Sequence, residues 1–333
     1  MSWSSQEVRL AQRPLGYPDS ETWEIADVEV GEPGPGEFVV NLELISLDPA
    51  MRGWLNDVRS YAPPVGIGEV MRAYGAGTIV ASQHDHYAVG DVVSGTFGVR
   101  EYAVSDGHDV TKLDLDVAPM ATWLGALGMP GMTAYFGLEE VGRVQPGQTV
   151  LVSAAAGAVG SIVAQLAKAK GCRVIGVAGG PEKVAWLQEV GLDEVIDRKE
   201  GDLIRQVRRA APDGVDFYFD NVGGEMLDAA LANLAFGARI ALCGAISAYN
   251  EEKLPEGPRR YMALLVFRAT MQGFLVTDYK DRYDEAVAEI SQLIAQDRIV
   301  ATETILDGGV TTFPDALLGL FSGVNTGKLL LKV

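Results

Sequence analysis

Residues 150–171 read VLVSAAAGAVGSIVAQLAKAKG and divide into a strand, a loop of small residues and an amphipathic helix. The hydrophobic run at 150–153 leads into Ala154-x-x-Gly157-x-x-Gly160, and a second strand follows at 173–178. Small residues let the backbone approach a pyrophosphate closely, and the helix N-terminus offers unpaired N–H groups to the anion. The order strand, loop, helix and strand therefore predicts a dinucleotide-binding domain.

Hydrophobic strands alternate with helical runs from about residue 121 onward. The expected strands are 150–153, 173–178, 194–197, 216–220, 239–243 and 270–276. Strands and helices in alternation at this spacing predict a doubly wound parallel sheet, the Rossmann arrangement.

The first 120 residues have a different pattern, with short alternating strands separated by Gly, Pro and Asp turns. We expect strands at 38–46, 77–81, 91–97 and 100–105, in a compact barrel or sandwich. The tail returns to β character at 300–306 and 328–333, around a helix at 312–322. We therefore expect a β-rich domain of residues 1–125 and 300–333, a nucleotide domain of residues 126–299, and a ligand cleft between them.

Composition restricts the function classes. A chain of 333 residues exceeds what one hydrophobic core usually holds, which favours two domains. The net charge of −18 opposes binding to nucleic acid or to an anionic membrane surface. The sequence contains no transmembrane run and no signal-peptide pattern, so we expect a cytoplasmic protein. Cys172 and Cys243, the only cysteines, are expected to be reduced core thiols.

The tip of the second strand indicates which nicotinamide cofactor is used. An acidic residue at this tip usually binds the ribose hydroxyls of NAD. This chain has Ala178-Gly179-Gly180-Pro181 there, with Lys183 in the first turn of the next helix, so nothing repels a 2′-phosphate and the pattern favours NADP. Two alternatives stay open: Lys183 is a solvated residue beside Glu182, and Arg198 either adds a second positive charge or points to solvent.

The sequence offers few ligands for a catalytic metal. Zinc alcohol dehydrogenases share this two-domain plan, but their catalytic zinc needs Cys and His ligands and their structural zinc needs four Cys. The three histidines are His84, His86 and His108, and the first two flank Asp85 in a polar turn. We therefore expect no metal. Hydride delivery to a conjugated C=C bond suits such a site, because the developing enolate needs only hydrogen-bond donors.

Several stretches carry a family resemblance. They are 46–53 (SLDPAMRG), 127–135 (LGMPGMTAY), 154–161, 178–183, 219–225 (FDNVGGE), 243–250 and 320–328. The chain resembles the zinc-independent medium-chain reductases, in the prostaglandin reductase/leukotriene dehydrogenase group and especially the bacterial NADPH-dependent curcumin reductases. The resemblance implies a Rossmann domain with a GroES-like barrel domain, and commonly a homodimer. It also implies that NADPH reduces the C=C bond of α,β-unsaturated ketones or aldehydes.

The resemblance also assigns roles to residues. It implies that Tyr249, Phe274 and Leu275 border the nicotinamide, and that Asn325 reaches it from the other domain. Together with the loop and charge arguments above, the predicted cofactor contacts are Ala156, Gly157, Ala158, Val159, Gly160, Gly179, Lys183, Arg198, Asn221, Cys243, Gly244, Ala245, Ile246, Tyr249, Phe274, Leu275 and Asn325. This chain departs from some relatives at Arg198 and at 265–267 (LVF), where those relatives have tyrosines. An acid role at 265–267 is therefore absent.

Reduction of an enone requires stabilisation of the carbonyl oxygen and a proton for the α-carbon. A tyrosine hydroxyl, whose pKa is ordinarily about 10, can supply either. Tyr249 is the first candidate, Tyr61 the second and Tyr261 the third; with Met129 they form the predicted substrate-binding set. The alternative is an aromatic wall that only packs against the substrate. Two other functions stay open: a quinone reductase of the same architecture, and a nucleotide-binding protein without catalysis.

Overall fold

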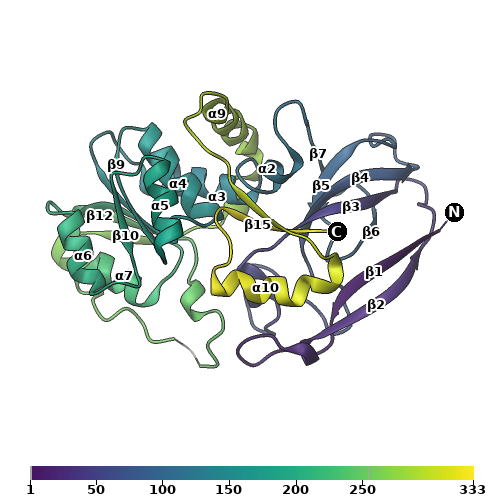
Figure 1. The fold of residues 1–333 in the computed structure, drawn as a ribbon, viewed down its shortest axis with the longest axis horizontal. Coiled ribbons are helices and arrows are strands. Elements are labelled where there is room, and N and C mark those ends of the chain that lie inside the picture. Colours follow the sequence, from purple (N-terminus) through teal and green to yellow (C-terminus); the bar gives the residue numbers. More distant parts are fainter. Residues whose placement is uncertain (1, 254) are drawn as a thin grey trace. The chain divides into compact units, whose positions relative to one another are not determined.

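The computed structural model describes residues 2–253 and 255–333, which form two compact units. Unit 1 contains residues 2–124 and 303–333, and unit 2 contains Gly125–Thr302. Figure 1 shows the elements of both units coloured along the sequence. Among the described residues, no helix is both long and apolar enough to cross a membrane.

Unit 2 is built on a parallel sheet of six strands in the order β10-β9-β8-β11-β12-β13. Its strands are β8 (Thr149–Ser153), β9 (Arg173–Ala178), β10 (Glu194–Asp197), β11 (Val215–Asp220), β12 (Leu234–Leu242) and β13 (Thr270–Gly273). Its helices are α3 (Met129–Phe136), the π-helix η2 (Gly137–Gly142), α4 (Ala158–Ala169), α5 (Pro181–Glu189), α6 (Leu203–Ala210), α7 (Gly224–Leu231), η3 (Ile246–Ala248), α8 (Ala263–Phe267), η4 (Val276–Arg282) and α9 (Tyr283–Ala295). The doubly wound sheet predicted from the sequence is confirmed.

The central strands of this sheet are apolar because helices cover them on both faces. Val150, Leu151 and Val152 of β8 are completely buried, as are Phe217 and Phe219 of β11. Burial of these side chains is the main free-energy term that holds the sheet together.

The strands end level with one another, which positions the candidate site. Ser153 of β8 pairs with Val177 of β9, and Asp220 of β11 pairs with Leu242 of β12. Leu242 in turn pairs with Gly273 at the end of β13. Because parallel strands point the same way, the loops that follow them leave the sheet at one edge, where such sheets bind ligands. We call this the carboxyl edge.

In unit 2, two strand boundaries differ from those expected by more than one residue. β12 starts at Leu234 rather than residue 239, because Leu234 pairs with Val215 of β11 ahead of a register shift, and Gly237, with a φ of 73°, interrupts the strand pattern between them and residue 239. β13 ends at Gly273 rather than residue 276, because its partner β12 ends at Leu242. Phe274 and Leu275 therefore lie in the loop beyond the strand.

Unit 1 contains a seven-stranded sheet, with strand order β14-β15-β3-β4-β5-β7 and β6 paired to β3, and a separate two-stranded sheet, β1-β2. Its strands are β1 (Trp3–Leu10), β2 (Trp23–Val30), β3 (Phe38–Ser46), β4 (Tyr74–Ser82), β5 (Val92–Thr96), β6 (Tyr102–Ser105), β7 (Thr111–Lys112), β14 (Glu303–Leu306) and β15 (Lys328–Lys332). Its helices are η1 (Ser20–Thr22), α1 (Ala50–Trp54), α2 (Met120–Leu124), η5 (Val310–Thr312) and α10 (Phe313–Ser322). The prediction missed the β1-β2 pair, because the charges of Glu7 and Arg9 obscure the apolar alternation of β1.

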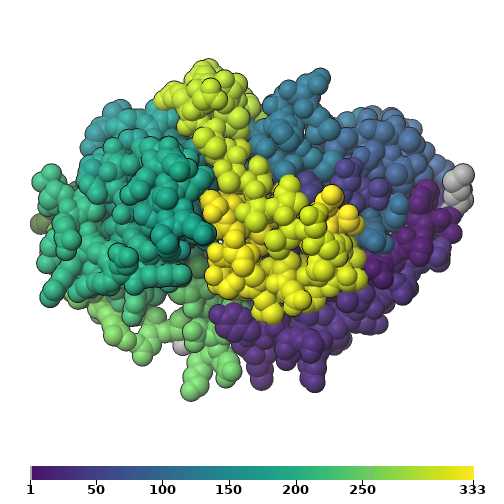
Figure 2. All heavy atoms as spheres, in the orientation of Figure 1, coloured from purple at the N-terminus to yellow at the C-terminus, as the bar shows by residue number. Residues whose placement is uncertain are grey.

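The C-terminal segment belongs to unit 1 through strand pairing. β15 pairs antiparallel with β3 and parallel with β14, and α10, yellow in Figure 2, covers part of the visible surface of this unit. Lys328 at the start of β15 is 2% exposed, and its ammonium donates to the Leu47 carbonyl and to Asp48 Oδ1, each at 2.7 Å. This buried ion pair attaches the tail to the segment between β3 and α1.

Candidate functional site

The loop between β8 and α4 is shaped by very small residues. Ala154 has a positive φ of 47°, and the Gly157 N–H donates to the Ala154 carbonyl at 2.9 Å, which closes a tight turn. A Cβ atom on Gly160 would overlap the same carbonyl, so only glycine fits there. Gly157 is the N-cap of α4, and no side chain caps this end of the helix. The first N–H groups of α4 can therefore bind an anion such as a diphosphate.

Three cationic side chains gather at the ends of β9 and β10. A Cβ on Gly179 would lie 3.0 Å from Arg198 Nε and 3.4 Å from Lys199 Cε, so both side chains lie across the glycine. Burial lowers the pKa of Lys183, and the nearby charges of Arg198 and Lys199 lower it further. Mutual repulsion of these charges is relieved when an anion binds among them. The loops are joined through Asp197 Oδ1, which accepts the Gly180 N–H at 3.1 Å and the Lys199 N–H at 2.9 Å.

Sequence reasoning found two members of this cationic group, Lys183 and Arg198, but missed Lys199. Lys199 could have been predicted from its position in the sequence, because it directly follows Arg198 after a predicted strand. Arg198 and Lys199 are exposed and Lys183 is half-buried.

The turn after β11 is held by a buried carboxylate that the sequence argument also missed. Asp220 is completely buried, and its Oδ1 accepts from the Tyr218 hydroxyl at 2.7 Å and from the N–H groups of Val222 and Gly223 at 3.0 and 2.8 Å. Burial raises the pKa of Asp220 above its ordinary value, with these hydrogen bonds acting in the opposite direction. The signal in the sequence was an acidic residue directly after three aromatic residues, at the end of the strand VDFYFD.

Asn221 is fixed on the neighbouring strand. Its backbone N–H donates to Ser153 Oγ at 2.9 Å and its side-chain amide donates to the Ser153 carbonyl at 2.8 Å. Asn221 therefore lies at the carboxyl edge next to the first residues of the β8–α4 loop. Its side chain is oriented by β8 rather than by its own strand.

The segment after β12 contains the remaining predicted contacts from this part of the sheet. Cys243 and Gly244 donate their N–H groups to the Asp220 carbonyl at 2.9 and 3.0 Å. Burial of the Cys243 thiol raises its pKa to about 12, so the thiol is protonated at neutral pH and is a poor nucleophile. The Ala245 N–H donates to the Tyr249 hydroxyl oxygen at 3.2 Å, which holds this phenol against the loop.

Phe274 packs toward the centre of unit 2 after leaving β13. Its ring meets that of Phe219 edge to face with centroids 6.1 Å apart, and a Cβ on Gly137 would lie 2.6 Å from Phe274 Cζ. Gly137 begins the π-helix η2, a helix type that is often found at functional sites. Leu275 follows and is 37% exposed.

The structure describes the other predicted residues as follows. Met129 is half-buried at the start of α3, and Tyr261 is 59% exposed ahead of α8. Tyr61 and Asn325 belong to unit 1: Tyr61 is 61% exposed, whereas Asn325 is buried and donates its side-chain amide to the Gly327 carbonyl at 2.6 Å. The predicted residues from 156 to 249 and Phe274–Leu275 thus lie in segments that follow strands ending at the carboxyl edge of unit 2.

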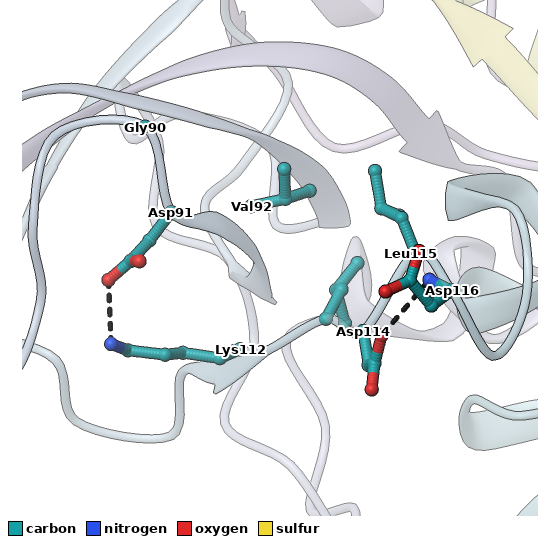
Figure 3. A pocket seen from close by; sticks show the side chains of 8 residues that line it. Gly90, Asp91, Val92, Lys112, Asp114, Leu115 and Asp116 are labelled. Atoms are coloured by element: carbon teal, nitrogen blue, oxygen red, sulfur yellow. Dashed lines mark hydrogen bonds and ion pairs between the residues drawn. The ribbon is translucent and has the colours of Figure 1, made fainter.

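A depression of about 430 Å³ in unit 1 is a different feature. It lies beside β5 and β7 and is lined by Gly90, Asp91, Val92, Lys112, Leu113, Asp114, Leu115 and Asp116 (Figure 3). Asp91 and Lys112 pair with each other at 2.6 Å, and Asp114 accepts the Asp116 N–H at 3.0 Å. The charges of Asp91 and Lys112 offset each other, and none of the predicted site residues lines the depression. Across residues 2–253 and 255–333, no three His, Cys, Asp or Glu side chains are grouped as metal ligands.

Comparison with known proteins identifies the family. A family profile described as the N-terminal domain of oxidoreductase matches residues 6–113, and one described as zinc-binding dehydrogenase matches residues 158–292. The chain is 42% identical to NADPH-dependent curcumin reductase of Escherichia coli, over 97% of this chain and 95% of that protein. It is 39% identical to NADP(+)-dependent 2-alkenal reductase of Nicotiana tabacum, over 99% and 98% of the two chains.

A solved structure gives the same result. CurA from Vibrio vulnificus, in complex with NADPH, matches with a TM-score of 0.93 and 42% identity, over 98% of this chain and 99% of that chain. Both the fold and the resemblance expected from the sequence are confirmed. With relatives of this identity covering nearly its whole length, the chain belongs to the medium-chain dehydrogenase/reductase family, in the group of oxidoreductases that contains curcumin reductase and 2-alkenal reductase.

Proposed function

We propose that this protein uses NADPH to reduce the C=C bond of α,β-unsaturated ketones and aldehydes. One observation carries the proposal: the glycine loop, the three cations and the Tyr249 hydroxyl all follow strands that end at the carboxyl edge of one sheet. A phosphate-binding turn, a group of charges for an extra phosphate and a proton donor are the parts that such a reaction needs. The relatives named for curcumin and 2-alkenal reduction support the substrate class.

The chain's own residues fit a phosphorylated dinucleotide. The uncapped N-terminus of α4 suits the diphosphate, and Gly160 lets this helix pack closely against the Ala154 carbonyl. Ala156, Ala158 and Val159 complete this loop. Lys183, Arg198 and Lys199 suit the 2′-phosphate, because a phosphate bound among them would offset positive charges that repel one another. When bound, NADPH supplies the hydride.

Asn221, Cys243–Ile246, Phe274 and Leu275 are proposed to border the nicotinamide half of the cofactor. The hydrogen bonds from Asn221 to Ser153 and from residues 243–244 to Asp220 support this assignment, because they hold these segments rigidly beside the β8–α4 loop. From unit 1 we add Asn325, as the resemblance implies.

Tyr249 is proposed to protonate the reduced substrate. Its hydroxyl accepts the Ala245 N–H, so the proton of the hydroxyl is not used in that bond. After the hydride reaches the β-carbon, the O–H bond of Tyr249 breaks and the proton passes to the enolate, and water restores the phenol. Tyr61 is the second candidate donor; with Met129 and Tyr261 it completes the proposed apolar substrate set. In the alternative, Tyr249 packs against the substrate as an aromatic side chain and donates no proton. The following test distinguishes this alternative from proton donation.

The test measures oxidation of NADPH and of NADH with a panel of enones, enals and quinones. We expect enone turnover with NADPH, and a loss of about a hundredfold in kcat with a smaller change in KM for Tyr249→Phe. An unchanged kcat in this variant would show that Tyr249 is only a wall. Turnover of quinones alone would support the quinone reductase, and NADPH binding without any turnover would support a non-catalytic protein.

We further propose that the protein is a cytoplasmic homodimer. Tyr261, Met262, Leu265 and Val266 are all more than half exposed, and their spacing puts them on one side of α8 and the turn before it. We call these four residues the α8 patch; the segment that contains it follows β12 and is green in Figure 2. Beside it β13 is an edge strand of the sheet. A second copy of the chain would cover both features. The two free cysteines suit a reducing compartment.

A further inference from the structure

The hydroxyl of Tyr249 lies directly over Gly244. A Cβ atom built on Gly244 would be 2.9 Å from the Tyr249 oxygen, closer than a carbon and an oxygen normally approach without bonding. The backbone of Gly244 is not in the left-handed region, so this glycine is not required for backbone conformation. What its missing side chain provides is room for the phenol. The Ala245 N–H next to it donates to the same oxygen.

We propose that Gly244 and the Ala245 amide form a seat that positions the Tyr249 hydroxyl for proton transfer. The inference rests on the proposed function and adds two positioning residues to it. Neither residue touches the substrate through a side chain in this role. Because Gly244 has no side chain, the phenol of Tyr249 can lie against the backbone there. The N–H of Ala245 then fixes the position of the phenolic oxygen by a hydrogen bond.

The seat is rigid because the backbone around it is attached at several points. Gly244 donates its N–H to the Asp220 carbonyl at 3.0 Å, and Ile246 donates to the Asn221 carbonyl at 3.2 Å. Ser247 donates to the Val222 carbonyl through both its N–H, at 3.2 Å, and its hydroxyl, at 2.6 Å. A methyl group on Gly244 would therefore be accommodated by movement of the Tyr249 ring and not by movement of the loop.

The seat also has a chemical consequence. When the Tyr249 proton leaves for the enolate, negative charge develops on the phenolic oxygen. A backbone N–H that already points at this oxygen stabilises the charge without reorganisation, as the donors of an oxyanion hole do. A shift of the phenol by a few tenths of an ångström weakens this bond and misplaces the proton, so the chemical step slows more than cofactor binding.

A double-mutant cycle tests the seat. Gly244→Ala is made in the wild type and in the Tyr249→Phe background, where the oxygen that the new methyl would strike is missing. In the wild type we expect kcat for an enone to fall about three- to tenfold, with little change in the KM for NADPH. In the Tyr249→Phe background the same substitution should cost much less.

The melting temperature of the cofactor-free protein gives a second readout. Gly244→Ala should lower it by about 2 °C in the wild type and by less in the Tyr249→Phe background. The ¹⁵N-resolved Ala245 amide proton should move upfield in Gly244→Ala as its hydrogen bond lengthens. Gly257→Ala is the matched control, because a Cβ at Gly257 meets nothing within 4 Å.

The outcomes separate failure of the seat from failure of the proposed function. Equal costs of Gly244→Ala in both backgrounds, in kcat and in melting temperature, would overturn the seat. A raised KM for NADPH in both backgrounds would show that the methyl strikes the cofactor instead. If Tyr249→Phe leaves kcat unchanged, the proton-donor role fails, while coupling in the melting temperatures would still report contact between Gly244 and the hydroxyl.

Discussion

At the scale of single residues, we attribute the cofactor preference to the positive charges of Lys183, Arg198 and Lys199, which lie close together. Asp197 lies nearby, yet its Oδ1 is occupied by the backbone N–H groups of Gly180 and Lys199. These hydrogen bonds, and then the charges of Lys199 and Arg198, lower the pKa of the Asp197 carboxyl, so Asp197 joins the two loops and also faces the cationic group. The lowered pKa of Lys183 records the repulsion and burial that a bound phosphate would relieve.

Lys183→Ala should therefore weaken the use of NADPH specifically. Loss of a charge-assisted bond to the 2′-phosphate is expected to lower kcat/KM for NADPH about tenfold or more, while kcat/KM for NADH stays nearly unchanged. Steady-state kinetics with both cofactors measure the ratio. Arg208→Ala removes an exposed positive charge from α6 and should change neither value. Equal losses with both cofactors would mean that Lys183 acts on something other than the extra phosphate.

At the scale of elements, the turn between β8 and α4 contains Ala154, which has a positive φ, and two glycines, Gly157 and Gly160, with different structural roles. Gly157 begins the helix, whereas Gly160 sits inside its first turn against the Ala154 carbonyl. Close contact between helix and turn places the first N–H groups of α4 at the proposed diphosphate site. The small residues of this loop thus allow the helix backbone to pack against the turn; they are not there to make the loop flexible.

Gly160→Ala should damage this element. Because the added methyl would overlap backbone atoms of residues 154 and 155, the loop must open, and we expect the Kd for NADPH to rise at least about tenfold. The melting temperature should fall as well. Fluorescence titration and thermal denaturation measure the two effects, with Gly257→Ala as the control that leaves both unchanged. Unaltered NADPH affinity would exclude this turn as the diphosphate site.

At the scale of the whole molecule, the α8 patch is a group of neighbouring apolar side chains that folding of unit 2 leaves exposed. The opposite side of α8 packs into the core through Ala263, Leu264 and Phe267. β13, which follows α8 in the chain, is the last strand of the sheet, and its outer edge is paired with no strand in the described part of the chain. An apolar helix face beside a bare strand edge is a combination that a second subunit would cover.

Leu265→Glu should therefore convert the proposed dimer into monomers. Placing a charge at a position that is 70% exposed in the single chain costs little unless a partner buries it. Analytical ultracentrifugation at micromolar concentration measures the change. Leu115→Glu, at an exposed leucine of unit 1, is the control and should remain dimeric. A wild-type protein that sediments as a monomer would refute the dimer directly.

Sequence reasoning succeeded where function depends on local pattern. The strand–loop–helix at 150–171, the absence of an acid after β9 and the placement of Lys183 are all read from neighbouring residues, and the parallel sheet follows from their repetition. Sequence reasoning was less accurate where pairing with a neighbouring strand sets the end of a strand, as in β13. It was also less accurate where charged residues obscure the alternation of apolar and polar residues, as in β1.

The sequence by itself determined that this chain contains a dinucleotide-binding sheet and which kind of cofactor it favours, because both depend on short-range order along the chain. Only the tertiary structure decided that Lys199 joins the cationic group, that Asp220 supports the turn after β11, and that Gly244 makes room for Tyr249. These contacts join loops that follow different strands. Their distances depend on strand register and side-chain direction, which no single stretch of sequence contains.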